Sequence, residues 1–236
     1  MECSLKDWLR CKTMKFKNVT FVFKDRIDAG RQLAKLLDSK YKKLNPLIIG
    51  VPRGGVEVAY YVAELLQTEL EMLVSKKLPY PGNKEYGFGA VAEDGSVYIA
   101  KERSEGLSPE TIDAIIDKQL QEIQLRVERY RQGRSIPAME GRTVILVDDG
   151  IATGVTLVPL IQLCRKKKAS KVVIAVPVAG RSFDERLEEA DVIEIAVRPA
   201  PFYAVGQVYE QFGDFPDDQL LKLLDQARAR SAHGKE

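Results

Sequence analysis

The stretch that decides the fold reads TVILVDDGIATGVT and runs from Thr143 to Thr156. A short apolar run, 143–147, leads straight into two acids, Asp148 and Asp149, and then into small residues that precede a pattern of helical spacing. Strands that alternate with helices predict a parallel sheet, and the ligand sites of such sheets lie at the carboxyl ends of the strands. We call residues 148–154 the acidic turn, and we expect a binding site there in an α/β fold.

The rest of the chain repeats this alternation of strands and helices. Apolar runs predict strands at 47–51, 71–75, 171–178 and 191–197, and apolar residues at helical spacing predict helices at 25–45, 58–66, 155–168, 182–189 and 217–230. A cap residue followed by proline begins a long amphipathic helix at about 108–132, whose apolar stripe packs on the core or on another subunit. We expect a doubly wound, mostly parallel sheet flanked by helices, with this inserted helix and a small C-terminal hood at about 199–216. The core at about 23–198 and these additions form a single domain, 1–236.

Composition argues against several classes of protein. The 36 basic and 34 acidic residues leave a formal charge of +2, so no global field favours nucleic acid or an acidic membrane surface. No apolar stretch approaches the roughly 20 residues of a membrane span, and residues 1–16 do not read as a secretory signal, so we expect a cytoplasmic protein. Three cysteines without a CxxC pair argue against a disulfide framework, and the single histidine, His233, argues against histidine-based metal sites.

The acidic turn offers two kinds of group to a ligand. Its small residues let the backbone approach a ligand closely, and amides at the start of a helix bind phosphate. Its paired carboxylates accept hydrogen bonds from ribose hydroxyls and can hold Mg²⁺ directly or through water. The chain has no GxxxxGKS, GxxxxGKT or GxGxxG sequence, so neither a P-loop nor a dinucleotide fold has its motif. The alternative is an ordinary strand-to-helix turn capped by acids.

The run from Val144 to Thr156 resembles the motif with which type I phosphoribosyltransferases bind phosphoribosyl pyrophosphate (PRPP). The similarity extends from about Phe23 to Leu224, and it is greatest to the uncharacterised bacterial and archaeal branch of that family. It implies the type I phosphoribosyltransferase fold, with acids that contact the ribose hydroxyls and small residues that wrap the 5′-phosphate. The PRPP-binding residues implied in this stretch are Asp148, Asp149, Gly150, Ala152, Thr153, Gly154 and Thr156, and the two acids also hold Mg²⁺, directly or through water.

The strand predicted at 47–51 ends in Pro52, Arg53, Gly54 and Gly55, which we call the PRGG loop. The resemblance implies that this loop binds the pyrophosphate and that it contains a strained or cis peptide. Arg53 is a candidate catalytic residue because its planar guanidinium matches phosphate oxygens. Pro52, Gly54 and Gly55 are the candidate PRPP-binding residues of the loop. Taken alone, the same four residues are equally consistent with a routine turn.

Proline and glycine interrupt the segment 76–95, which we interpret as a long mobile loop, with or without a hairpin inside it. The resemblance implies that it closes over the reacting centre and keeps water away from it. Lys76, with Lys77, offers a cation to the pyrophosphate, although solvated lysines at a strand end are equally common. Glu85 and Glu93 are candidate general bases by position, because Ala152 stands where enzymes acting on 6-oxopurines carry an aspartate. The catalytic candidates are therefore Arg53, Lys76 and Glu85.

The hood is rich in aromatic residues and proline. The resemblance implies that it roofs an acceptor pocket in which a flat base stacks on Phe202 or Tyr203. Such stacking adds roughly 0.5–1.5 kcal/mol beyond the burial of area. Simple packing of these rings in the core accounts for them equally well.

The activity implied by the resemblance is an Mg²⁺-dependent transfer of the ribose 5-phosphate of PRPP to a nitrogenous base or amine, with release of pyrophosphate. The partners that we expect are PRPP, an unidentified acceptor and further copies of the chain, and neither nucleic acid nor a membrane. One alternative is a PRPP-binding regulator without turnover, and another is a hydrolase or phosphorylase acting on a ribosyl phosphate. Retention of Arg53, Gly54 and Gly55 favours catalysis, because a sensor needs less machinery for the leaving group.

Overall fold

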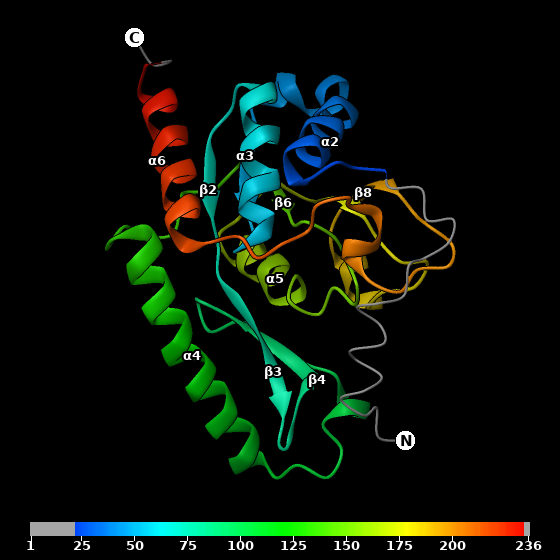
Figure 1. Cartoon of the computed structure of the whole chain (residues 1–236). Coiled ribbons are helices and arrows are strands. Elements are labelled where there is room, and N and C mark those ends of the chain that lie inside the picture. The colour runs from blue at the N-terminus through cyan, green and yellow to red at the C-terminus, as the bar shows by residue number, and fades with distance from the viewer. Residues whose placement is uncertain (1–21, 234–236) are drawn as a thin grey trace.

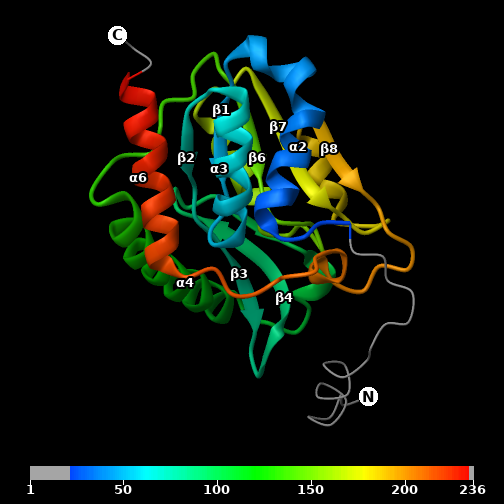
Figure 2. The ribbon, with the colours of Figure 1, turned by 45° about the horizontal axis from the view of Figure 1, so that its top comes forward.

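The structure is a computed structural model that describes residues 22–233 of the chain. Its centre is a five-stranded parallel sheet in the order β2-β1-β6-β7-β8 (Figure 1), and all five strands are labelled in Figure 2. The strands are β1 Leu47–Gly50, β2 Leu70–Met72, β6 Thr143–Val147, β7 Lys171–Val178 and β8 Val192–Val197. The chain turns to opposite sides of β1 when it adds β2 and β6, so the strand order reverses between β1 and β6. In open α/β sheets this reversal marks the crevice in which ligands bind.

Helices cover both faces of the parallel sheet, as predicted. The helices α2 Arg26–Tyr41, α3 Gly54–Leu66 and α6 Asp217–His233 lie on one face, which is turned toward the viewer in Figure 2, and α5 Val158–Lys166 lies on the other. Alternate residues of each strand face the two layers: Ile145 packs with the first group of helices, and Leu146 packs with α5. The central strands β1, β6 and β7 are buried on both faces and therefore read as nearly unbroken apolar runs, whereas the edge strands β2 and β8 each contain a glutamate.

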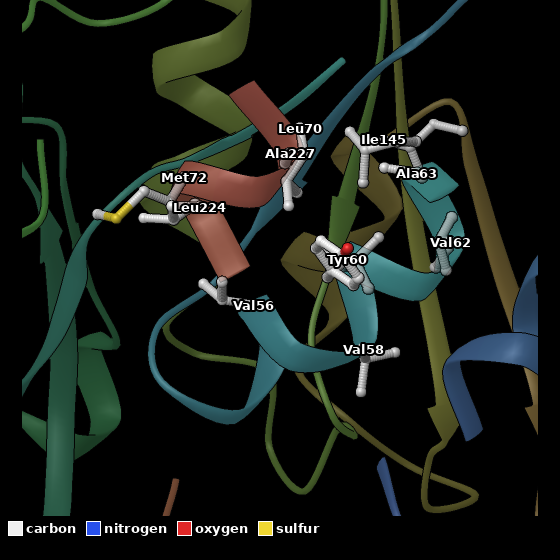
Figure 3. Packing of buried hydrophobic residues seen from close by; sticks show 14 of the residues in the cluster. Val56, Val58, Tyr60, Val62, Ala63, Leu70, Met72, Ile145, Leu224 and Ala227 are labelled. Atoms are coloured by element: carbon white, nitrogen blue, oxygen red, sulfur yellow. The ribbon is translucent and has the colours of Figure 1, made fainter. Parts of the chain in front are cut away.

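The contact between α3, α6 and β2 forms the outer part of the larger core (Figure 3). Leu224 and Ala227 of α6 are buried together with Val56 of α3 and Met72 of β2. The C-terminal helix is thus held by apolar burial at roughly 25 cal/mol per Å². No described helix is apolar over enough length to span a bilayer.

The segment after β2 folds into a second, antiparallel sheet, with β3 Ser75–Tyr80, β4 Asn83–Ala92 and β5 Val97–Ile99 (Figure 1). The interpretation of 76–95 as a long irregular loop was therefore wrong, and the alternative of a hairpin inside it is confirmed. Gly89 explains part of the error, because a Cβ there would lie 2.1 Å from the carbonyl oxygen of Tyr98 in β5. Glycine is present here for a close approach of strands, not for a loop.

The long helix α4, Pro109–Arg131, lies along the antiparallel sheet as an insertion between β5 and β6 (Figure 1). Its apolar stripe packs against the larger core, in agreement with the predicted packing role. Other boundaries also agree closely: β6 and β7 have their predicted limits, and α6 begins at Asp217. The helix predicted from residue 155 begins only at Val158, because residues 155–157 form a turn.

Replacing Ser108 with alanine is expected to lower the free energy of unfolding by about 1 kcal/mol. The Ser108 hydroxyl caps α4 by accepting a hydrogen bond from the amide of Thr111 at 3.3 Å. Urea denaturation measures the change, and Ser108→Asp is the control, because aspartate also accepts this bond and should stay within roughly a few tenths of a kcal/mol of the original. An equal loss in both variants would contradict the capping role.

Outside the candidate site, three predictions concern residues or side chains that the structure does not describe. The expected absence of a secretory signal at 1–16 is one, and the thiol state of Cys3 and Cys11 is another. The side chain of His233 is the third. The remaining cysteine, Cys164, is a buried free thiol in α5, and burial raises its pKa to about 12.

Candidate functional site

The acidic turn and the PRGG loop meet at the reversal point between β1 and β6. The amide of Val51, just before the PRGG loop, donates to the carbonyl oxygen of Val147, just before the acids, at 2.9 Å. A Cβ on Gly54 would lie 2.2 Å from Oδ2 of Asp149, and a Cβ on Gly55 would lie 2.8 Å from the Cα of Asp148. The two glycines thus let one loop pack directly onto the other, so the structure brings these predicted site residues together.

Asp149 is held by an arginine that the sequence patterns did not identify. Arg26, the first residue of α2, is 9% exposed, and its Nε donates to Oδ2 of Asp149 at 2.8 Å. The hydroxyl of Tyr209 donates to the main-chain oxygen of Asp149 at 2.7 Å. A cation at the start of a helix opposes the helix dipole. That unfavourable position is the one local signal that Arg26 has a distant partner.

The two carboxyl groups of the acidic turn titrate as neighbours in a half-buried site. Burial raises the pKa of both, and the charge of Asp149 raises the pKa of Asp148 further. Arg26 opposes the shift of Asp149, and the Asp149 amide opposes that of Asp148 by donating to its Oδ1 at 2.8 Å. The doubly ionised pair is therefore unfavourable by itself, and hydroxyl donors or a cation would stabilise its charge.

The backbone of the acidic turn is tied to the segment that follows β7. The amide of Ile151 donates to the carbonyl of Val178 at 2.8 Å, and the amide of Asp184 donates to the carbonyl of Thr153 at 2.9 Å. Gly154 has a φ of +77°, in the left-handed region that favours glycine. Ala152 and Thr153 between these anchors are exposed, so an anion can reach the turn.

Arg53 extends from the PRGG loop toward the start of α6. Its side chain is 41% exposed, and its guanidinium lies 3.7 Å from Asp214 and 3.8 Å from Asp217. The Pro52–Arg53 peptide is cis, as the resemblance implies. Both ion pairs are long, and the Arg53 side chain is partly exposed to solvent. Pairs of this kind are worth little, so they leave the guanidinium available to a stronger anion.

The other candidate catalytic side chains do not gather at this point. The backbone of Lys76 lies near the acidic turn, because the hydroxyl of its neighbour Ser75 donates to the carbonyl of Thr156 at 2.8 Å. The ammonium of Lys76, however, is paired with Glu122 of α4. Both oxygens of Glu93 bind Arg131 in a buried ion pair. The side chain of Glu85 lies outside the described part of the structure.

Comparison with known proteins shows the family of this chain. The family described as phosphoribosyl transferase domain matches residues 23–204. The chain belongs to this family. Two Mycobacterium tuberculosis proteins, from strains CDC 1551 and H37Rv and provisionally named phosphoribosyl transferases, are each 43% identical over 209 residues, which cover 87% of this chain and 47% of theirs. The chain thus spans about half the length of these relatives.

The crystal structure of TT1426 from Thermus thermophilus has the same fold. It is 35% identical to this chain with a TM-score of 0.74, and the alignment covers 86% of this chain and 98% of TT1426. Together with the family match, this likeness confirms the predicted type I phosphoribosyltransferase fold.

The hood of this phosphoribosyltransferase domain adjoins the acidic turn through the segment after β7. A cavity of about 310 Å³ lies between the hood and the segment after β7, and it is lined by Gly180, Arg181, Ser182, Pro199, Ala200, Pro201 and Phe202. Phe202 contributes one wall and packs so closely on Gly180 that a Cβ there would lie 2.9 Å from its ring. Tyr203, by contrast, is 69% exposed.

A larger cavity, of about 940 Å³, lies where the strands begin, at the opposite end of the sheet. Three arginines and three glutamates line it, and two pairs of them bind each other: Arg142 binds Glu69 at 2.8 Å, and Arg230 binds Glu64 at 3.2 Å. This balance gives a phosphate little net attraction. Cavity size therefore does not decide the site of this phosphoribosyltransferase domain, and the family's motif lies at the other end.

Magnesium is the cation that the family implies. The described residues hold no cluster of three or more acidic, histidine or cysteine side chains that would form a protein-only metal site. The adjacent carboxylates of Asp148 and Asp149 nevertheless fit Mg²⁺, because this ion is typically bound by one or two carboxylates together with substrate phosphates and water.

Proposed function

We propose that this domain is an Mg²⁺-dependent phosphoribosyltransferase that moves the ribose 5-phosphate of PRPP to a nitrogenous base or amine. The observation that carries the proposal is the contact of the PRGG loop with the acidic turn, because the reacting carbon of PRPP lies between a ribose phosphate and a pyrophosphate. In the reaction the acceptor nitrogen forms a bond to that carbon while the bond to the pyrophosphate oxygen breaks and its electron pair leaves with pyrophosphate. Positioning and charge stabilisation supply most of the rate.

The acidic turn binds the ribose phosphate in this proposal. The carboxylates of Asp148 and Asp149 accept hydrogen bonds from the ribose hydroxyls, and the exposed backbone at Ala152 and Thr153 receives the 5′-phosphate. Gly150, Gly154 and Thr156 complete the loop. The Arg26 guanidinium and the Asp149 amide, which bind the two carboxylates, keep these acceptors oriented.

The PRGG loop binds the pyrophosphate. Arg53 supplies the cation on this side, because the ammonium of Lys76 is paired with Glu122. Asp148 and Asp149 would hold Mg²⁺, directly or through water, and the ion would supply positive charge to the pyrophosphate. The amides of Gly54 and Gly55 lie at the start of α3, where the helix dipole favours an anion.

Incubation with PRPP, Mg²⁺ and a panel of purines, pyrimidines and small amines tests the proposal. Pyrophosphate release that depends on one acceptor is the expected result. We expect that acceptor outside the 6-oxopurines, because Ala152 provides no proton acceptor. Binding of PRPP without release under any acceptor would identify a sensor, and release without any acceptor would identify a hydrolase. Absence of PRPP binding would overturn the site itself.

Replacing Tyr203 with alanine is expected to raise the KM for the acceptor roughly 2- to 10-fold, because a stacked aromatic pair contributes about 0.5–1.5 kcal/mol. The exposure of Tyr203 suits it to this role better than Phe202, which forms a packed wall. Steady-state kinetics with varied acceptor measures the change, and Tyr203→Phe keeps the ring as the matched control. A KM that is equally raised in both variants would argue against stacking.

A further inference from the structure

Arg26 joins parts of the site that are far apart in the sequence. Its Nε donates to Asp149 of the acidic turn, and its Nη1 donates to the carbonyl of Gly213 in the hood, both at 2.8 Å. Its guanidinium carbon also lies 4.1 Å from the centre of the Phe212 ring. One nearly buried side chain thus binds a carboxylate of the proposed PRPP site, which we call the donor site, with one edge and the hood with another.

The surroundings of Arg26 make this link rigid. A Cβ on Gly54 would lie 2.7 Å from its Nε, so the PRGG loop covers the ion pair. The Phe212 ring lies 4.9 Å from that of Tyr209, whose hydroxyl binds the main chain of Asp149. The hood therefore reaches Asp149 by two routes, and Arg26 provides the charged one.

We propose that Arg26 is a positioning residue that orients the Asp149 carboxylate for the ribose of PRPP and anchors the hood to the donor site. Guanidinium suits this task because its planar fork can bond a carboxylate and a carbonyl while its face stacks on an aromatic ring. Lysine offers a point charge and lacks the fork. The donor-site part of this proposal rests on the proposed function, whereas the anchoring of the hood does not.

The donor-site part is tested by calorimetric titration of the full chain with PRPP and Mg²⁺. Arg26→Gln is expected to weaken binding roughly tenfold, since the Asp149 carboxylate loses the charged hydrogen bond that orients it. Arg26→Lys should recover part of the affinity. In an Asp149→Asn background, the Arg26→Gln change should add less than about twofold, because the partner through which it acts is already altered.

The anchoring of the hood is tested without any ligand. The amides of Glu210 and Gln211 donate to the carbonyls of Phe23 and Lys24 at 2.9 Å, next to Arg26. Their hydrogen exchange is expected to accelerate in Arg26→Gln. Arg31→Gln, at an exposed position of the same helix, is the matched control and should change neither exchange nor affinity.

Unchanged PRPP affinity in a folded Arg26→Gln protein would overturn the positioning role. The same would follow if the losses of affinity caused by Arg26→Gln and Asp149→Asn were fully additive in the double variant. Unchanged exchange at Glu210 and Gln211 would overturn the anchoring role. If Arg26→Gln does not fold, Arg26→Lys supports the same comparisons. A wild-type protein that fails to bind PRPP refutes the proposed function, and the exchange experiment still decides whether Arg26 holds the hood.

Discussion

Asp148→Asn is expected to weaken PRPP binding roughly 10- to 100-fold, because a carboxylate that accepts hydrogen bonds contributes about 1.5–3 kcal/mol per bond. The same change should not reduce thermal stability. Burial and the charge of Asp149 raise the pKa of Asp148, so its ionised form at neutral pH is less favourable in the folded chain than in the unfolded one. Asparagine removes that charge and still accepts the hydrogen bond from the Asp149 amide.

Two measurements on the same protein separate the site from the fold. Calorimetry gives the affinity for PRPP with Mg²⁺, and a thermal melt without ligand gives the stability. Glu210→Gln, an exposed change in the hood, serves as the control for the loss of one negative charge. Normal PRPP binding by Asp148→Asn would refute the assignment of the acidic turn, and a lower melting temperature of Asp148→Asn would refute the electrostatic argument.

Arg131→Met is expected to lower the free energy of unfolding by about 3–5 kcal/mol, the usual cost of leaving a buried charge without its partner. Arg131 at the end of α4 and Glu93 after β4 are 4% and 3% exposed, and they form two hydrogen bonds. Burial raises the pKa of Glu93, and Arg131 opposes that shift. Without Arg131 the pKa rises further, so the loss of stability should shrink as the pH falls and the carboxyl group becomes protonated.

Urea denaturation at neutral and mildly acidic pH measures this loss. Arg131→Met combined with Glu93→Leu should restore much of it, because an apolar pair of similar volume often replaces a buried ion pair at little cost. Arg126→Met on the same helix is the matched control, with an expected change within about 0.5 kcal/mol. A double variant as unstable as the single one would contradict the account.

The central sheet and the acidic turn could be predicted from the sequence because their signals are local. Strands such as β6 and β7 are buried on both faces, so each appears as an unbroken apolar run with sharp limits. The turn that follows β6 combines acids with small residues, and few other functions require that combination. The PRGG loop carries a weaker local signal, and its role was predicted only from the resemblance.

Long-range partners could not be predicted in this way. Arg26 and Asp149 are 123 residues apart, and no pattern around either of them names the other. The β3–β4 hairpin could be given only as an alternative within a loop, and the third strand, β5, was missed, because proline and glycine normally interrupt strands. Gly89 instead admits the backbone of β5, a neighbour that only the folded chain reveals.

The hydrogen bonds that tie the acidic turn to the segment after β7 also affect how tightly a ligand can bind. Fixing the backbone of one residue costs about 1–2 kcal/mol of conformational entropy. Ile151 and Thr153 are already fixed by their bonds to Val178 and Asp184 in the folded chain. A phosphate that enters the turn therefore has little main chain left to order, and more of its interaction energy remains as affinity.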